Sequence, residues 1–173
     1  CGLSMGGMIG QTFALKYPGI FKTMILADTT SRYPAEGFAM WEQRIQAARA
    51  NGMSGLVDGT LSRWFTEPFR KSRPDVIARV AKMIGGTSAE GYASCGDAIR
   101  RINVTARLKE IPTPTLVIVG DQDAGTPPAM SEEIRANKPG AELVTIKDAS
   151  HISNMEQPAA FTKGMLDFLA KHR

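Results

Sequence analysis

The apolar positions of the chain fall into two patterns. Residues 23–27, 115–120 and 143–146 are short, mostly apolar runs that end at polar residues or glycine, which is typical of buried strands in a parallel sheet. In residues 8–15 and 158–169 the apolar positions instead recur every three or four residues, which is typical of helices packed on one side. Helices and strands that alternate in this way predict an α/β fold with helices flanking a parallel sheet.

Residues 31–106 break this alternation, because helix-like stretches follow one another with no strand pattern between them. The first ends at Asn51-Gly52, the second ends near Pro68, the third begins at Pro74, and the fourth opens with the capping-box pattern Thr87-x-x-Glu90. We therefore predict a four-helix cap over residues 31–106. It would be inserted between two strands of a core made of residues 1–30 and 107–173.

The first residues of the chain carry the chemical motif that organises this prediction. Residues 2–6 read Gly-Leu-Ser-Met-Gly, the G-x-S-x-G pattern of a nucleophile elbow, and a helix pattern follows at once. In such an elbow the serine, here Ser4, sits on a sharp turn between a strand and a helix. A Cβ at Gly2 or Gly6 is expected to collide with the neighbouring backbone. The amide of Met5 is expected to face a developing oxyanion.

A serine hydroxyl needs a base and an orienting acid, and the chain offers few choices. Of its two histidines, His172 lies in a terminal basic run, whereas His151 follows the last predicted strand. Asp123 follows the strand before it, so the order Ser4, Asp123, His151 is the order found in α/β hydrolases. For the acid, Asp121 is a near alternative and Asp28 a more distant one.

Composition changes this picture in one respect. The net charge is +4, and all of the excess lies in residues 31–106, which hold 11 Lys or Arg against 7 Asp or Glu. No basic block with interleaved aromatics is present, which argues against binding of nucleic acid and favours a small anionic substrate.

No apolar run is long enough to span a membrane. Cys1 and Cys95 form no disulfide framework or metal spacing, so we expect a cytoplasmic protein.

Several stretches resemble the α/β-hydrolase family, and among its members the bacterial 3-oxoadipate enol-lactonases of the β-ketoadipate pathway, which act in aromatic-compound catabolism. The resemblance rests on residues 1–10, 63–66, 90–93, 126–128 and 151–158. It implies that Ser4, Asp123 and His151 are catalytic and that the chain hydrolyses an enol-lactone carrying a carboxylate. The reaction it implies needs no cofactor or metal. The positive excess of residues 31–106, with Arg63 beside Trp64, predicts that Arg63 helps to hold a substrate carboxylate while the aromatic face covers the lactone ring, and Tyr92 is a further candidate for substrate binding.

The resemblance covers the C-terminal part of such a hydrolase, from the elbow onward. Family members carry upstream strands and a loop that gives a second oxyanion donor. We therefore expect either a second chain that supplies the N-terminal half or a longer parent chain. Two alternatives stay open: a carboxylesterase or carbon-carbon hydrolase of the same fold, and a non-catalytic fragment or interaction module.

Overall fold

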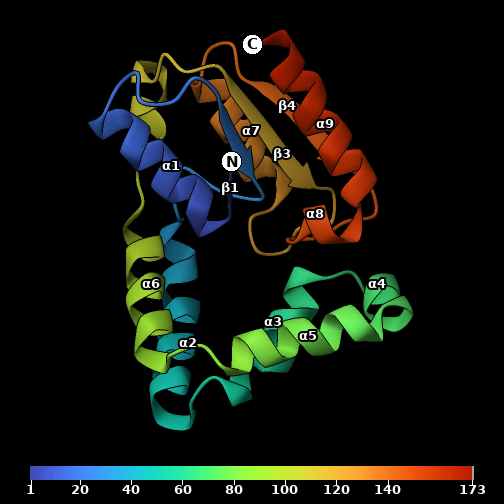
Figure 1. Cartoon of the computed structure of the whole chain (residues 1–173). Helices are drawn as coiled ribbons and strands as arrows, with labels where there is room; N and C mark the ends of the chain where they lie inside the picture. The colour runs from blue at the N-terminus through green and yellow to red at the C-terminus, as the bar shows by residue number, and fades with distance from the viewer. Residues whose placement is uncertain (173) are drawn as a thin grey trace. The chain divides into compact units, whose positions relative to one another are not determined.

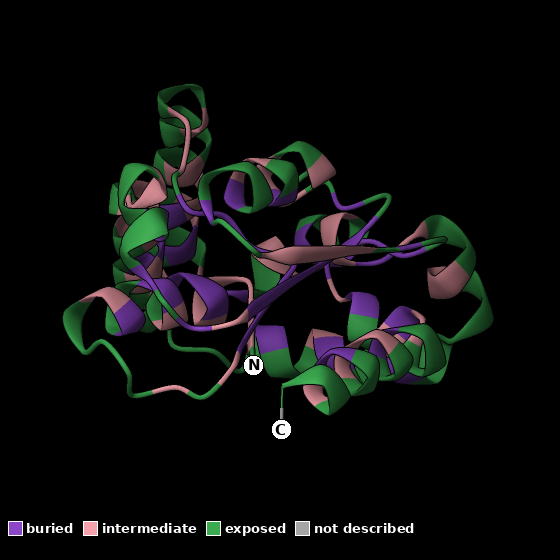
Figure 2. Ribbon diagram, turned by 90° about the horizontal axis from the view of Figure 1, so that it is seen from above, coloured by how far each residue is buried: buried purple, intermediate pink, exposed green. Residues whose placement is uncertain are grey.

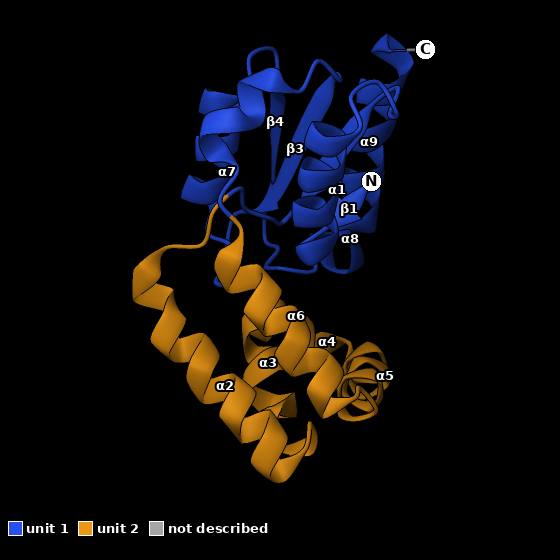
Figure 3. Cartoon of the chain, turned by 90° about the vertical axis from the view of Figure 1, so that its left-hand side faces the viewer, with its two compact units in different colours: residues 1–31, 103–173 blue, residues 32–102 orange. Residues whose placement is uncertain are grey.

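The apolar runs pair into a single four-stranded sheet. The computed structural model describes residues 1–172, which divide into two compact units, residues 1–31 with 103–172 and residues 32–102 (Figure 3). All pairings in the sheet of the first unit are parallel, and its spatial order is the sequence order. The strands are β1 (Gly2–Leu3), β2 (Met24–Ala27), β3 (Thr115–Gly120) and β4 (Glu142–Ile146).

Helices cover both faces of this sheet. Successive residues of a strand point to opposite faces, so the apolar strands place apolar side chains on both. One face packs on Phe161 and Phe168 of α9 (Pro158–Lys171). The other packs on Ala14 of α1 (Met5–Lys16), Ile134 of α7 (Pro128–Asn137) and Leu108 of the 3₁₀ helix η3 (Thr105–Glu110) (Figure 1). The strands β2 and β3 are buried at every position, whereas β1 and most of β4 are of intermediate burial (Figure 2). The predicted α/β core is confirmed.

The sheet places four loops at one edge, since the carboxyl ends of parallel strands lie together. Ser4 follows β1, Asp28 follows β2, and Asp123 follows β3. His151 follows β4 and precedes the short helix α8 (Ser153–Glu156). Sequence positions nearly 150 residues apart, such as Ser4 and His151, thus meet at one place.

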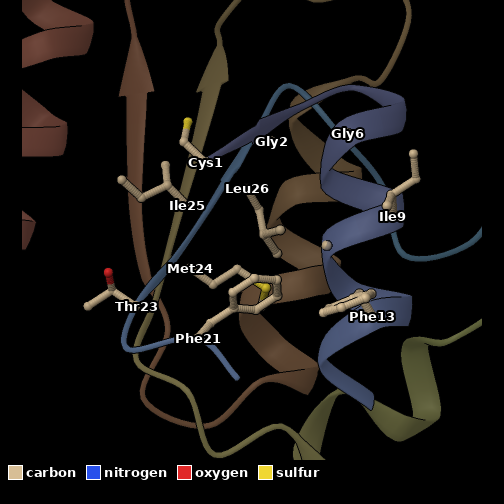
Figure 4. Close-up of a pocket in the computed structure, with 11 residues that line it drawn as sticks. Cys1, Gly2, Gly6, Ile9, Phe13, Phe21, Thr23, Met24, Ile25 and Leu26 are labelled. Atoms are coloured by element: carbon tan, nitrogen blue, oxygen red, sulfur yellow. The ribbon is translucent and has the colours of Figure 1, made fainter. Parts of the chain in front are cut away.

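At the outer strand of the sheet, β1 and α1 border an apolar groove of about 400 Å³ (Figure 4). The register of β1 on β2 pairs Gly2 with Leu26, which sets Cys1 opposite Ile25. Within residues 1–172 nothing in β1 lies opposite Met24 or Thr23, so the first part of β2 has a strand partner only on its β3 side. The groove includes these residues and the exposed side chains Ile9 and Phe13 of α1.

The second unit is helical. Two longer helices, α2 (Phe38–Asn51) and α6 (Ala89–Arg101), pack side by side, and α3 (Val57–Trp64) packs on α5 (Pro74–Gly85) (Figure 3). Its other elements are η1 (Ala35–Gly37), η2 (Ser54–Leu56) and α4 (Glu67–Ser72). No helix within residues 1–172 is long and apolar enough to cross a membrane.

Two details of the helical unit differ from the sequence prediction. Pro68 does not end the second predicted helix but lies in the first turn of α4, a separate short helix, so this part of the described chain holds five α-helices and not four. Proline suits a first turn, where no intrahelical acceptor is available for its nitrogen. The cap of α6 is Ser88, whose hydroxyl accepts from the Gly91 amide at 3.2 Å, so the Thr87 capping box was wrong by one residue.

The two elbow glycines are not equivalent. A Cβ built on Gly2 would lie 2.4 Å from the carbonyl carbon and oxygen of Gly6, which no side chain can tolerate without a backbone shift. A Cβ on Gly6 would meet nothing within 4 Å, so the expectation that both glycines avoid a collision is wrong for Gly6. Gly6 lies at the start of α1, where its Cα faces open space.

This difference predicts opposite effects of two matched substitutions. Gly2→Ala should lower the free energy of unfolding by about 1–3 kcal/mol, because the backbone of the turn must move. Gly6→Ala should leave it unchanged or raise it by up to about 1 kcal/mol, because alanine favours a helix over glycine. Urea unfolding of both variants measures the difference, and equal destabilisation by the two would contradict it.

Candidate active site

Ser4 occupies the sharp turn between β1 and α1. Its backbone lies at φ 52° and ψ −118°, a conformation that costs a non-glycine residue free energy and is common at functional turns. Two hydrogen bonds hold this turn against the end of β2: the Ser4 amide donates to the Ala27 carbonyl at 2.9 Å, and the Thr29 hydroxyl donates to the Ser4 carbonyl at 2.6 Å. The strained turn is therefore fixed by the neighbouring strand.

His151 bridges the serine and a carboxylate. Its Nε2 lies 2.9 Å from Ser4 Oγ, and its Nδ1 lies 2.9 Å from Asp123 Oδ2 and 3.0 Å from Asp123 Oδ1. Both His151 and Asp123 are buried, at 5% and 3% exposure. Because an ionised carboxylate can only accept, this arrangement assigns the ring proton to Nδ1 and leaves Nε2 to accept from the serine hydroxyl.

The loop after β3 orients the Asp123 carboxylate. Oδ1 accepts from the amides of Gly125 and Thr126 at 2.7 and 2.9 Å, and Oδ2 accepts from the Thr126 hydroxyl at 2.8 Å. These donors satisfy a buried negative group that also faces the imidazole, which is how proteins lower the free-energy cost of burying a charge.

The two rival carboxylates lie elsewhere. Asp121 is exposed and accepts from the Ala149 amide at 3.3 Å. Asp28 is fully buried, but its oxygens accept from the Gly120 amide at 2.9 Å and the Ser153 hydroxyl at 2.6 Å. Asp123 is thus the carboxylate that forms hydrogen bonds with His151.

Asp28 joins three of the loops that build the site. It follows β2, accepts from the end of β3 at Gly120, and accepts from Ser153 at the start of α8, two residues after His151. Burial raises the pKa of Asp28 from 3.8 to about 7, against the hydrogen bonds from Ser153 and Gly120, which lower it. Nearby Asp123 raises this pKa further, and His151 lowers it.

Sequence reasoning did not identify Thr126, Ser153 or the clamping role of Asp28. The sequence signalled only the bond from the Gly125 amide to Asp123, because a loop aspartate commonly accepts from the backbone two residues later; nothing signalled the bond from the Thr126 hydroxyl. Ser153 also carried no signal, since its bond to Asp28 joins residues 125 positions apart.

The residues expected to bind substrate all lie in the helical unit. Arg63 and Trp64 end α3, and Tyr92 lies on α6. All three side chains are half-buried. Arg63 and Tyr92 are close enough for each charge to affect the pKa of the other. A role of these three residues in substrate binding stays a prediction.

Comparison with known proteins identifies the family. Residues 1–158 match the sequence profile of the family described as alpha/beta hydrolase fold. The chain belongs to the α/β-hydrolase fold family. This agrees with the parallel sheet flanked by helices and with the elbow at Ser4, and it confirms the resemblance drawn from the sequence.

Individual members of the α/β-hydrolase family narrow the comparison. The chain is 37% identical over 161 residues to 3-oxoadipate enol-lactonase 2 of Acinetobacter baylyi, which covers 93% of this chain and 59% of that protein. The crystal structure of the enol-lactonase from Burkholderia xenovorans LB400 superposes with a TM-score of 0.93 at 38% identity, covering 98% of this chain and 64% of that one. An esterase from Thermogutta terrifontis matches with a TM-score of 0.90 at 31% identity, covering 99% of this chain and 64% of that one. The chain spans about three fifths of the length of these relatives.

The raised pKa of Asp28 predicts a pH dependence of stability. Between pH 3.8 and about 7 the folded chain keeps a proton on Asp28 that the unfolded chain releases, so titration of Asp28 makes rising pH favour unfolding across this window and adds nothing above it. The side-chain amide of the Asp28→Asn variant cannot titrate, and it can still accept from Gly120 and donate to Ser153. The wild type should therefore lose up to about 4 kcal/mol more stability than Asp28→Asn between pH 4 and pH 8, at about 1.4 kcal/mol per pKa unit.

Urea unfolding at a series of pH values measures this difference. Asp58→Asn, at an exposed position on α3, serves as the control and should keep the wild-type slope. If wild type and Asp28→Asn show the same slope between pH 4 and pH 7, Asp28 is not a buried proton-holding group.

Proposed function

We propose that this chain carries the serine nucleophile, the base and the acid of an enzyme that hydrolyses an ester or lactone, with 3-oxoadipate enol-lactone as its substrate. The observation that carries the proposal is the continuous path of hydrogen bonds from Ser4 through His151 to Asp123. The names of the Acinetobacter and Burkholderia relatives support the choice of an enol-lactone. The positive excess of residues 31–106 supports an anionic substrate.

The first half of the reaction opens the ring. The Ser4 oxygen attacks the carbonyl carbon of the lactone while its proton moves to His151 Nε2, and Asp123 stabilises the imidazolium that forms. The Met5 amide, in the first turn of α1 where helix amides have no intrahelical acceptor, donates to the oxyanion. The tetrahedral intermediate then collapses, and the bond between the former carbonyl carbon and the ring oxygen breaks. The departing enolate takes the proton from His151 and stays tethered to the acyl group on Ser4.

The second half returns the enzyme to its starting state. Water gives a proton to His151 Nε2 as its oxygen attacks the acyl carbon. The bond to Ser4 Oγ then breaks, Ser4 regains its proton from His151, and a carboxylic acid is released. No redox step or co-reactant other than water enters the cycle.

A carboxylesterase would use the same groups, and the likeness to the Thermogutta esterase makes it the second candidate. Relative kcat/KM values for the enol-lactone and for simple esters separate the two.

The carboxylate assignment gives a sharp test of the proposal. In the complete hydrolase, Asp123→Asn should lower kcat by about 10⁴, because an amide facing Nδ1 favours the wrong imidazole tautomer. Asp121→Asn, two residues away and exposed, should retain activity within about threefold, since surface changes of this kind have small effects. Ser4→Ala should lower kcat by several orders of magnitude.

Steady-state hydrolysis of the lactone measures all three variants, and circular dichroism checks that each is folded. Equal losses for Asp123→Asn and Asp121→Asn, or activity of Ser4→Ala within about tenfold of wild type, would overturn the proposed roles.

We further propose that hydrolysis requires residues beyond these 173. Met5 provides one oxyanion donor, and loss of a second donor costs about 10²–10³ in kcat. The groove beside β1 supports the same conclusion. The amides of Met24 and Asp28 donate toward β3, to the carbonyls of Pro114 and Ile118, so the intervening Ile25 amide points to the β1 side, where a strand that continues the line of β1 alongside β2 fits. We expect that strand to come from the remainder of the hydrolase fold.

The isolated chain tests this expectation. Alone, it should hydrolyse the lactone at least about a hundredfold more slowly than the completed hydrolase. It should also associate through the exposed groove, which sedimentation velocity would detect as oligomers. A monomeric 173-residue chain with full activity would contradict both parts of the prediction.

A further inference from the structure

A cluster of aromatic and cationic side chains lies within the helical unit, on residues that the reaction described above does not use. Trp41 and Arg44 occupy neighbouring turns of α2, and Tyr92 faces them from α6. The ring of Trp41 lies 6.0 Å from that of Tyr92 and 6.2 Å from that of Tyr33, centroid to centroid. The guanidinium carbon of Arg44 lies 5.4 Å from the Trp41 ring centroid. We call Tyr33, Trp41, Arg44, Arg63 and Tyr92 the cap cluster.

Arg44 differs from Arg49 of α2 and Arg100 of α6, which both form ion pairs with carboxylates. Its described contacts are the sulfur of Met40 at 3.0 Å and the Trp41 ring, and neither carries a charge. The acidic side chains of α2 and α6 are engaged by other arginines: Glu90 pairs with Arg49, while Glu42 and Asp97 both pair with Arg100. Arg44 is half-buried, so water screens its charge less than at an exposed site.

A second guanidinium lies near enough to repel it. Burial lowers the pKa of Arg63. The positive charge of Arg44 lowers this pKa further, so the two guanidinium groups repel each other. Arg63 Nη2 donates to the hydroxyl of Thr60 at 3.2 Å, on the preceding turn of α3. Two like charges in a partly buried place raise the free energy of the folded state, and an anion bound between them would lower it.

Trp41 provides the independent sign of a missing acceptor. Its indole Nε1 is buried and has no hydrogen-bond partner among the described residues. An unsatisfied buried donor costs about 1–3 kcal/mol, and native proteins rarely retain one without a ligand or water to accept from it. The cap cluster therefore combines an indole donor that lacks an acceptor with two cations, and no described contact brings a carboxylate to Arg44.

We infer that the cap cluster is a binding site for the carboxylate of a small aliphatic anion, with Arg44 and Trp41 as principal ligands and Arg63 as a second cation. A carboxylate suits this set because its two oxygens can accept from a guanidinium and an indole N–H together. The tyrosine rings supply an apolar wall for the aliphatic part of the ligand. The inference deepens the proposed function and rests on it only for the identity of the ligand as substrate.

Adipate binding to the 173-residue chain tests the site without any hydrolysis. Adipate is titrated at low ionic strength and followed by calorimetry and by tryptophan fluorescence, since the chain has two tryptophans. Its neutral analogue adipamide is titrated in parallel. We expect saturable binding of adipate and about ten- to a hundredfold weaker binding of adipamide, because hydrogen bonds to a charged group are worth about 1.5–3 kcal/mol.

Variants locate the binding. Arg44→Gln should weaken adipate binding by about ten- to a hundredfold, whereas Arg49→Gln, on the same helix but paired with Glu90, should leave it unchanged. Trp41→Phe keeps a ring at this position but removes the N–H, and should weaken binding by about threefold to tenfold. Thermal unfolding checks that the variants are folded. If Arg44→Gln does not fold, Arg44→Lys replaces it. Lysine cannot form two parallel hydrogen bonds to the adipate carboxylate, so this variant should bind adipate measurably more weakly.

Each outcome decides the inference. Absence of saturable adipate binding, equal binding of adipamide, or equal weakening by Arg44→Gln and Arg49→Gln would overturn it. Failure of the proposed function is seen separately. If Ser4→Ala leaves hydrolysis intact while Arg44→Gln alone abolishes adipate binding, the carboxylate site stands and the catalytic roles fall.

Discussion

The backbone of Ser4 lies at φ 52° and ψ −118°, and two hydrogen bonds from the end of β2 hold it there. The site depends on this turn, because it places the serine oxygen within 2.9 Å of His151 at the carboxyl edge of the sheet. The strain is tolerated because β2 is buried at all four positions and cannot yield to it. Gly2 completes the constraint, since any larger residue there would push α1 away from the strand.

The remaining groups are arranged so that each buried charge or proton has a partner. Asp123 accepts from two amides, a hydroxyl and the imidazole. Asp28 takes the opposite solution to burial, since its raised pKa keeps a proton on the carboxyl over much of the acid range. Two buried carboxylates a short way apart thus avoid mutual repulsion in different ways, one through hydrogen-bond donors and the other through a raised pKa. Through Ser153, Asp28 also fixes the segment that carries His151.

Much of the core could be predicted from sequence, because its strands are apolar at nearly every position and follow helices with clear periodicity. The buried run of β3 and the elbow motif at Ser4 are examples of such local signals. The short helix α4 was missed because a proline is compatible both with the end of one helix and with the first turn of the next. The structural difference between Asp123 and Asp121 depends on loop geometry, which spacing alone does not determine.

The contacts of the cap cluster also could not be predicted from the sequence. Nothing in the sequence near Arg44 distinguishes it from Arg49, five residues later on the same helix. They differ because Arg49 reaches Glu90 on α6, whereas Arg44 lies over an aromatic ring. Such differences arise from how two helices pack, and periodicity predicts only that they pack. The same holds for Gly6, which the elbow motif includes although a Cβ there would meet no atom within 4 Å.

The central claim is that Ser4 is a nucleophile activated by His151. Its most direct test is covalent labelling of the protein with diethyl 4-nitrophenyl phosphate, followed by peptide mass spectrometry. We predict a single diethylphosphoryl group on the peptide that contains Ser4, with labelling abolished in a His151→Gln variant that remains folded. Labelling at another serine, or unchanged labelling of Ser4 without His151, would contradict it.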